Sequence, residues 1–377
     1  MSRIRSIAIL ACATVGTAYA AAPSSPQPNS QPGPFEVVTV AEGLEHPWGL
    51  ALLPDGTMLV SERAGRLRSI DARGTISAPL KGVPKVAAGG QGGLLDLTLS
   101  PTFEQDRLVY FSFSEPGDGG SGTAVARGRL GDGALEDVQV LWRQTPKVDS
   151  QLHFGSRIVF GPNDTMFITT GDRYNQRPKV QDLSTTIGKV IRLKRDGSIP
   201  QDNPFVGRDD AKPEIWSYGH RNIQAAALHP QTNELWTIEH GARGGDELNN
   251  PQPGKNYGWP VITYGRDYSG EKIGEGTEKA GMEQPVYYWD PVIAPSGLEV
   301  YTGDRYPGWQ GSFLVGSMSP GALVRLTVED GRVVAEERHL SELESRIRDV
   351  KQGPDGYIYV VTDAPEGRVL RIVPAGQ

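Results

Sequence analysis

The residues best suited to chemistry lie in residues 216–260, where an Arg-Asn pair, a short apolar strand and a glycine-rich acidic loop follow one another. In the loop, three glycines precede Asp246 and Glu247. Glycine lets the backbone bend sharply, so that several oxygens can point inward. Carboxylates and backbone carbonyls on a flexible backbone are the ligands that a hard cation such as Ca²⁺ prefers. The other interpretation of this loop is a solvated turn that carries charged residues.

Two further positions could take part in catalysis. His153, in the segment Leu-His-Phe-Gly-Ser-Arg, is a candidate general base, because a neutral imidazole titrates near physiological pH. A packed or exposed histidine is the alternative. Arg221, followed by Asn222, offers a planar and permanently charged fork that suits a carboxylate or a developing oxyanion. A structural ion pair is the alternative for the arginine.

Two more segments could hold a ligand. Gln91 stands among four glycines, which would let the backbone approach a ligand and present one amide, or would simply form a flexible turn. Arg346 and Arg348 are two residues apart, so on an extended strand both side chains point to one face. Two guanidinium groups on one face suit a polyanionic ligand, although surface salt bridges are the ordinary alternative.

Several other chemistries are excluded by the sequence. It contains no P-loop, no dinucleotide-binding glycine motif, no His-Glu-x-x-His and no Gly-x-Ser-x-Gly. The formal net charge of −7 gives no general reason to bind nucleic acid or an acidic membrane surface. The single cysteine, Cys12, lies in the N-terminal segment, so we expect neither disulfides nor thiol catalysis in the mature protein.

The N-terminal segment is typical of an export signal. Arg3 and Arg5 precede an apolar run over residues 7–15, and Ala-Tyr-Ala at residues 18–20 fits the small-x-small cleavage rule. We therefore predict a signal peptide over residues 1–20, with periplasmic localisation and without a lipid anchor. Residues 21–34 are rich in Pro, Ser and Gln and are predicted to be a disordered lead-in. The apolar run is too short to span a membrane as a helix, and no transmembrane segment is expected in the mature chain.

The mature chain repeats one pattern: a strand, a proline-centred turn, a second strand and often a third. Asp-Gly or Asn-Asp next to the proline supplies the corner of the turn. The turn prolines are separated by 47, 61, 68 and 124 residues, and because the last interval is about double, a further unit must lie within it. The prolines are Pro54, Pro101, Pro162, Pro230 and Pro354.

Six such units, with no helical apolar stripe between them, predict an all-β protein: a six-bladed β-propeller of four-stranded antiparallel blades. Residues 35–377 form this single domain. The strand expected at residues 35–40 precedes the first unit, and it is positioned to complete the last blade and close the ring. Residues 340–347 are the only short helical turn that we predict.

Seven short motifs in this order resemble the soluble quinoprotein glucose/sorbosone dehydrogenase family, and in particular its aldose sugar dehydrogenase branch. The resemblance covers nearly all of residues 35–373. The motifs are HPWGL at His46, GGQGGLLD at Gly89, HFGSRI at His153, GHRNIQ at Gly219, GARGGDELN at Gly241, KNYGWP at Lys255 and RIRDV at Arg346.

The resemblance implies a propeller that binds pyrroloquinoline quinone (PQQ) at the channel mouth, with Ca²⁺ as activating ion. It implies that His153 takes the proton of the anomeric hydroxyl and that Arg221 stabilises charge on the reduced carbonyl oxygen. The carbonyls of Gly241 and Ala242 would bind the activating Ca²⁺, and Glu247 with Tyr257 would bind a second, structural Ca²⁺. The residues implied to hold the cofactor are Gln91, Arg221, Asn222, Arg346 and Arg348.

Three positions depart from the family pattern. Leu152 stands where glucose dehydrogenases of the family carry an acidic residue before the catalytic histidine. The fifth blade lacks an expected cofactor-binding lysine in residues 313–318. Ala242 replaces a proline, which changes little because the ligand is a carbonyl. We expect these differences to affect sugar specificity more than cofactor binding.

The sequence thus predicts a periplasmic PQQ- and Ca²⁺-dependent aldose dehydrogenase that oxidises the anomeric carbon to a lactone. Its partners would be a small aldose and a soluble or membrane electron acceptor, in a monomer or homodimer. Two alternatives stay open: a non-catalytic extracellular binding propeller, and a metal-dependent lactonase with a carboxylate-rich central site.

Overall fold

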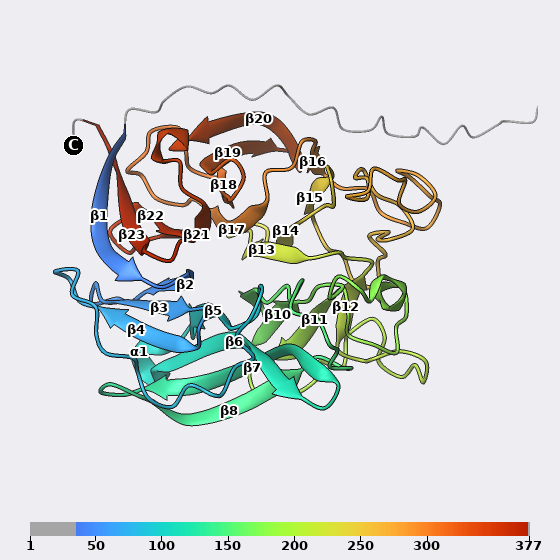
Figure 1. Cartoon of the computed structure of the whole chain (residues 1–377), viewed down its shortest axis with the longest axis horizontal. Coiled ribbons are helices and arrows are strands. Elements are labelled where there is room, and N and C mark those ends of the chain that lie inside the picture. The colour runs from blue at the N-terminus through green and yellow to red at the C-terminus, as the bar shows by residue number, and fades with distance from the viewer. Residues whose placement is uncertain (1–34, 376–377) are drawn as a thin grey trace, which may run out of the picture.

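Six antiparallel sheets form a ring around a central channel (Figure 1). The computed structural model describes residues 35–375. The predicted signal peptide (1–20), the lead-in (21–34) and the last two residues lie outside the described residues.

The first three blades follow one another along the chain. The first contains β2 (Pro47–Leu52), β3 (Met58–Glu62) and β4 (Arg66–Ile70), extended by a bridge between Ile70 and Ile76. The second contains β5 (Leu94–Leu99), β6 (Leu108–Gly117), β7 (Gly120–Leu130) and β8 (Leu135–Arg143). The third contains β9 (Ile158–Gly161), β10 (Thr165–Thr169), β11 (Lys189–Lys194) and β12 (Ile215–Tyr218).

The last three blades complete the ring. The fourth contains β13 (Ile223–Leu228), β14 (Leu235–Glu239), β15 (Asp246–Asn249) and β16 (Tyr287–Trp289). The fifth contains β17 (Pro295–Val300), β18 (Phe313–Ser317), β19 (Ala322–Glu329) and β20 (Arg332–His339). The sixth contains β21 (Ile347–Gln352), β22 (Ile358–Thr362), β23 (Gly367–Pro374) and β1 (Phe35–Leu44).

The ring is closed in two ways. The innermost strands β2, β5, β9, β13, β17 and β21 each contact the next, and β21 contacts β2. On the outside, β1 pairs antiparallel with β23, so that both ends of the described chain share one blade (Figure 1). The predicted six-bladed propeller and its closure by the first strand are confirmed.

The turns between the two inner strands have the predicted form. Between β2 and β3, Gly56 N donates to Leu53 O at 3.0 Å, and Thr57 N donates to the Asp55 carboxylate at 2.9 Å. Gly56 has φ +83°, a conformation that glycine adopts without strain. The turn between β21 and β22 repeats these bonds, with Gly356 donating to Gly353 O. The Pro-Asp-Gly sequence therefore ends one strand and starts the next in the same way at both places.

Three short helical turns occur within residues 35–375: α1 (Phe103–Asp106), η1 (Arg177–Val180) and η2 (Ser341–Leu343). The turn expected at residues 340–347 is η2, but the prediction that it is the only one was wrong. The other two depend on side chains rather than on an apolar stripe. Asp106 accepts hydrogen bonds from the hydroxyls of Ser100 and Thr102 beside α1, and Lys189 Nζ donates to the carbonyl of Val180 in η1.

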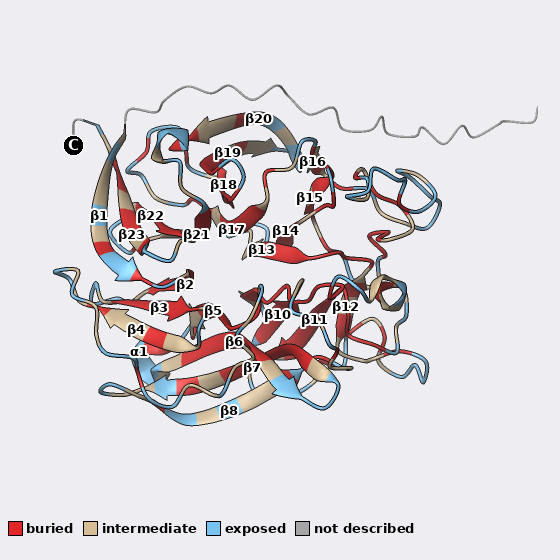
Figure 2. Cartoon of the chain, in the orientation of Figure 1, coloured by how far each residue is buried: buried red, intermediate tan, exposed pale blue. Residues whose placement is uncertain are grey.

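Apolar side chains fill each of the six interfaces between neighbouring blades. Buried residues occur in the strands of every blade (Figure 2). In β18, Phe313 and Val315 face the fourth blade while Leu314 faces the sixth. Strands packed on both faces read as continuous apolar runs, not as alternating ones. Among residues 35–375, none of the helices combines the length and apolar character needed to cross a membrane.

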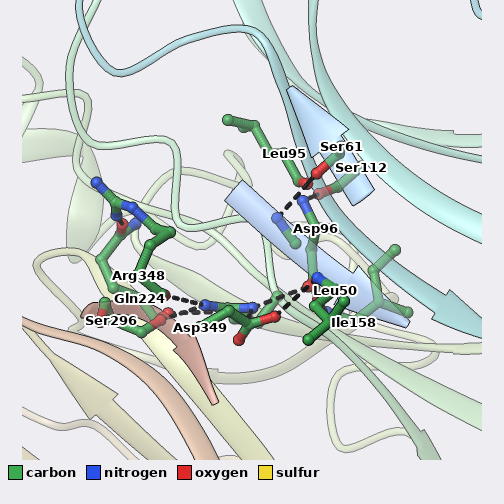
Figure 3. A network of polar contacts seen from close by, with 12 residues as sticks. Leu50, Ser61, Leu95, Asp96, Ser112, Ile158, Gln224, Ser296, Arg348 and Asp349 are labelled. Carbon is green, nitrogen blue, oxygen red and sulfur yellow. Dashed lines mark hydrogen bonds and ion pairs between the residues drawn. The ribbon is translucent and has the colours of Figure 1, made fainter. Parts of the chain in front are cut away.

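Arg157, directly before β9, joins the inner strands of the blades. Its Nη1 forms ion pairs of 2.9 Å with both Asp96 of β5 and Asp349 of β21. The two other nitrogens donate to backbone carbonyls: Nε to Gln224 of β13, and Nη2 to Ser296 of β17. The carboxylates in turn accept backbone N–H groups, Asp96 from Ile158 of β9 and Asp349 from Leu50 of β2 (Figure 3). This network, which we call the Arg157 hub, connects all six blades.

Candidate active site

The polar residues predicted from the sequence gather at one mouth of the channel, where the inner strands begin. Gln91 precedes β5, His153 precedes β9, and Arg221 with Asn222 precedes β13. Arg346 and Arg348 stand at the start of β21, and the Gly241 loop joins β14 to β15. Because all inner strands run in the same direction, segments far apart in the sequence meet there.

A cavity of about 140 Å³ opens at this mouth. Three predicted cofactor residues line it: Gln91, Arg346 and Arg348. Its other lining residues are Trp48, Arg63, Leu95, Phe154, Gly155, Gln224, His240, Ala294 and Met318.

His153 is oriented by Asp172. Its Nδ1 lies 2.6 Å from Oδ1 of Asp172, and both side chains are buried. The other carboxylate oxygen accepts a hydrogen bond from Nε1 of Trp259 at 2.8 Å. An ionised carboxylate that faces Nδ1 keeps the proton on that nitrogen, which leaves the Nε2 lone pair as the basic atom. Asp172 therefore supplies the orientation that Leu152, the residue before the histidine, cannot.

The electrostatic environment keeps the imidazole neutral. Burial lowers the pKa of His153; the hydrogen bond to Asp172 acts in the other direction, and nearby Arg221 and Arg173 lower the pKa further. Burial alone would raise the pKa of Asp172, but the hydrogen bond and charge of His153, with Arg221, bring it below its usual value. The pair is thus a neutral base hydrogen-bonded to an ionised carboxylate.

Two amides connect His153 to the cavity. Oε1 of Gln91 accepts the backbone N–H of His153 at 2.8 Å. Oδ1 of Asn222 accepts the backbone N–H of Gly155 at 3.2 Å and the side-chain amide of Gln224 at 3.3 Å. The Nδ2 of Asn222 is buried and has no hydrogen-bond partner in the part of the chain that the structure describes. The two predicted cofactor residues therefore also fix the backbone on either side of the base.

Arg221 is a buried cation that uses only some of its hydrogen-bond donors. Its Nη1 donates to the carbonyls of His240, at 3.0 Å, and Gly241. The guanidinium lies 5.2 Å from the ring centroid of Trp259. Nε and Nη2 are buried without a hydrogen-bond partner among residues 35–375. An unpartnered buried donor is costly, so these atoms fit a ligand that brings acceptor oxygens.

Arg346 and Arg348 face the same cavity, as their spacing predicted. Arg348 pairs with Asp363 at 2.6 Å, and Arg346 lies 3.6 Å from the same oxygen. Burial lowers the pKa of Arg348, and Nε of this residue has no partner. Met318 lines the cavity on the fifth blade, where the lysine of the family pattern is missing. One carboxylate for two guanidinium groups leaves positive charge available to an anion.

The Gly241 loop is folded by Asp246. One carboxylate oxygen of Asp246 accepts Gly241 N at 2.7 Å, and the other accepts Ile293 N and Ala294 N, each at 2.8 Å. Burial raises the pKa of Asp246 to about 6. The Gly241 carbonyl already accepts the Arg221 guanidinium. Ala242 is buried in an apolar cluster with Trp259. The carbonyl predicted to bind Ca²⁺ thus faces a cation already, that of Arg221.

Glu247 and Tyr257 share a second, small cavity with Glu239, Gly241 and Arg221. Desolvation and the neighbouring Glu239 raise the pKa of Glu247 well above its usual value. The hydroxyl of Tyr257 donates to Asn250 O at 2.7 Å and accepts Gln252 N at 2.9 Å. A cation contact from Tyr257 would therefore use its backbone carbonyl. Among residues 35–375, no three His, Cys, Asp or Glu side chains gather as a metal centre.

Sequence reasoning missed several residues at the mouth: Asp172, Arg173, Tyr174, His240 and the cavity cation Arg63. Asp172 follows the apolar strand β10 after only two residues, Thr170 and Gly171. A carboxylate so close to the end of the second strand of the third blade could have been recognised as a partner for His153.

Of the predicted residues, Arg221 lines the second cavity instead of the first, and His153 and Asn222 line neither. Fold and site together define a propeller enzyme class in which a buried His-Asp pair lies next to a cavity lined by Gln91, Arg346 and Arg348. The family described as Glucose / Sorbosone dehydrogenase matches residues 44–371. The chain belongs to this family. It is 47% identical, over 349 residues, to the aldose sugar dehydrogenase YliI of Escherichia coli, with 91% of this chain and 94% of that relative covered.

Two solved structures extend the comparison. The soluble aldose sugar dehydrogenase of Escherichia coli in its apo-form superimposes with a TM-score of 0.88 at 46% identity, covering 90% of this chain and 99% of that one. The PQQ-bound form of the aldose sugar dehydrogenase from Streptomyces coelicolor gives a TM-score of 0.75 at 30% identity, with 91% and 99% covered. The family resemblance and the propeller fold inferred from the sequence are confirmed.

Proposed function

We propose that the protein is a periplasmic PQQ- and Ca²⁺-dependent dehydrogenase that oxidises the anomeric carbon of cyclic aldoses to lactones. The observation that carries this proposal is the buried His153–Asp172 pair beside donors without acceptors on Arg221, Asn222 and Arg348. The names of the relatives and the PQQ-bound neighbour support it.

His153 acts as the base in this proposal. Its Nδ1 proton is held by Asp172, so Nε2 would take the proton of the anomeric hydroxyl. The imidazolium formed would be stabilised by the ionised carboxylate at 2.6 Å. Water is restricted there because both side chains are buried, so the proton transfer would occur in a region of low dielectric constant.

The donors at the mouth fit the cofactor. Arg346 and Arg348 would bind carboxylates of PQQ, and Gln91 and Asn222 would hold its polar edge. Arg221, through its unpartnered Nε and Nη2, would stabilise negative charge that develops on a cofactor oxygen. When bound, PQQ would supply hydride acceptance and Ca²⁺ would supply Lewis-acid polarisation, neither of which side chains provide.

We propose two Ca²⁺ positions. The carbonyls of Gly241 and Ala242 would hold the activating ion, which requires the Arg221 guanidinium to share or release the Gly241 carbonyl. Glu247 and the Tyr257 carbonyl would hold a structural ion. The carboxylates of Glu239 and Glu247 line the same small cavity, and a divalent cation would offset their mutual repulsion.

The remaining assignments rest on the sequence. Residues 1–20 would be cleaved on export to the periplasm, residues 21–34 would form a disordered lead-in, and residues 35–377 would form the catalytic domain. The reduced enzyme would pass electrons to a soluble or membrane acceptor, and it would act as a monomer or homodimer.

The two alternatives make different demands on the channel. A lactonase needs central carboxylates that are open to a metal, whereas Asp96 and Asp349 are both paired with Arg157. A binding propeller has no need of an ordered base, whereas His153 is held by Asp172. Both observations favour the dehydrogenase.

The test is to reconstitute apoprotein with PQQ and Ca²⁺ and to measure dye-linked oxidation of an aldose panel. We expect turnover that is lost on chelation and that falls roughly 10²- to 10⁴-fold in His153→Ala. His229→Ala, which changes a histidine in the turn after β13, is the matched control and should keep full activity.

PQQ titration followed by absorbance provides a readout independent of turnover. Failure to bind the quinone would refute the dehydrogenase and support the binding propeller. Quinone binding without oxidation of any aldose would refute the proposed substrate class while leaving the cofactor site in place.

A further inference from the structure

Tyr174 is an exposed aromatic side chain in contact with the proposed base. Its ring centroid lies 5.5 Å from that of His153, with an interplanar angle of 78°. Tyr174 is 41% exposed. Within residues 35–375, the other exposed large apolar side chains are those of Tyr268 and Val334. The ring of Tyr174 is thus open to solvent on one side and in contact with the proposed base on the other.

The position of this ring is tied to that of the base by one atom. Oδ1 of Asp172, which faces Nδ1 of His153, also accepts the backbone N–H of Tyr174 at 2.8 Å. A shift of the tyrosine backbone would therefore disturb the carboxylate that orients His153. The two side chains form one unit at the mouth of the channel.

The backbone that presents Tyr174 is strained. Arg173 and Tyr174 have φ of +53° and +65°, and consecutive non-glycine residues rarely adopt this left-handed conformation. Such strain persists only where the surroundings enforce it, and it concentrates at functional sites. Here the outward turn places the tyrosine ring in solvent rather than in the core.

The buried side chain of Arg173 anchors this turn. Its guanidinium is fully buried, with Nε donating to Leu152 O at 2.9 Å and Nη1 to Ser121 O at 2.8 Å. It also lies 3.7 Å from the ring centroid of Phe154. The segment thus has a rigid buried anchor on one side of the backbone and an exposed ring on the other.

We propose that Tyr174 is a substrate-binding residue whose ring stacks against the apolar C–H face of the pyranose when the anomeric hydroxyl points at His153. A tyrosine offers a large, rigid, amphipathic surface with little conformational entropy to lose, which suits a neutral polyol. Tyr174 thereby selects cyclic sugars over open-chain polyols. This inference rests on the proposed function, since it names a specificity residue of the same site.

The kinetic test uses Tyr174→Ala and Tyr174→Phe in the PQQ- and Ca²⁺-loaded enzyme, with Tyr268→Ala as the matched exposed-tyrosine control. Loss of the ring should raise the KM for an aldohexose about fivefold, within the range of aromatic stacking, while kcat stays within about twofold. Tyr174→Phe keeps the stacking face and should behave as wild type, and so should Tyr268→Ala.

A binding measurement separates stacking from support of the base. Methyl β-glucopyranoside has no free anomeric hydroxyl and is not oxidised, so its saturation-transfer NMR signal on the loaded enzyme reports binding alone. We expect transfer to the pyranose ring protons in wild type and Tyr174→Phe, strong loss in Tyr174→Ala, and little transfer to sorbitol in any variant.

Two results would overturn the inference. One is an unchanged KM and glucoside signal in folded Tyr174→Ala, verified by its melting temperature. The other is a fall in kcat with unchanged KM, which would make Tyr174 a support for His153 only. Neither affects the proposed function, which fails if the wild-type enzyme binds no quinone or oxidises no aldose.

Discussion

Arg157 and Arg221 are both buried in the channel, 2% and 3% exposed, yet their surroundings are opposite. All three nitrogens of Arg157 are engaged, by two carboxylates and by backbone carbonyls from neighbouring blades. Within the described residues, the Arg221 side chain is hydrogen-bonded through Nη1 alone, while its Nε and Nη2 have no partner. The guanidinium of Arg157 forms direct ion pairs with two carboxylates, whereas the hydrogen bonds of the Arg221 guanidinium go to backbone carbonyls.

The difference in hydrogen-bond partners distinguishes a structural arginine from one that is suited to bind a ligand. A buried charge that is fully paired holds the blades together and has no capacity left for a ligand. A buried charge with unmet donors costs folding free energy, and native proteins keep such groups where a ligand completes them. Arg157 therefore belongs to a structural hub, whereas Arg221 has the properties expected of the proposed binding site.

The largest effect should follow from breaking the hub. Arg157→Met leaves Asp96 and Asp349 buried without their cation, and we expect the free energy of unfolding to fall by about 3–5 kcal/mol. Urea denaturation followed by tryptophan fluorescence measures this. Arg73→Met, which removes an exposed ion pair with Asp71, is the control and should leave the midpoint unchanged. An equally small effect in both variants would show that the hub does not hold the blades.

An Arg-to-Met substitution at Arg221 should have the opposite effect: little loss of stability and a large loss of activity. Arg221→Met removes unsatisfied donors, so the urea midpoint should change little or rise, whereas kcat should fall roughly 10²- to 10³-fold through loss of charge stabilisation. Dye-linked kinetics and denaturation on the same sample give both numbers. Strong destabilisation with normal specific activity would place Arg221 among the structural arginines.

Asp172→Asn tests the orientation of the base. The amide cannot hold the Nδ1 proton as an ionised carboxylate does, so we expect kcat/KM to fall roughly 10²-fold with little change in quinone binding. PQQ titration alongside the kinetics separates the two. If activity survives, His153 is oriented by something other than Asp172.

The smallest effect is a displacement of the pH profile. His153 must be neutral to act as base and its pKa is lowered mainly by burial, so activity should persist below pH 6.5 and fall only as the pH passes through the lowered pKa. Asp172 raises that pKa, so Asp172→Asn should move the acid limb of kcat/KM to still lower pH. A limb that moves upward in the variant would contradict the assignment of His153 as the titrating base.

Much of the fold could be predicted from local patterns. The Pro-Asp-Gly turns at Gly56 and Gly356 form the same bonds in two blades because turn geometry depends on adjacent residues. The spacing of Arg346 and Arg348 placed both on one face because strand geometry has a period of two. The helical turns α1 and η1 were missed because they depend on side chains such as Asp106 and Lys189 rather than on periodicity.

The sequence by itself determined the six-bladed ring and most of the residues at its mouth, since turns, strand periods and short motifs are local properties. Only the tertiary structure decided which residues pair. Asp172, after β10, pairs with His153, before β9 of the same blade, and Arg157 meets carboxylates from β5 and β21 of two other blades. Whether a buried arginine holds the fold or waits for a ligand depends on those partners, because its desolvation must be compensated by groups brought together from different blades.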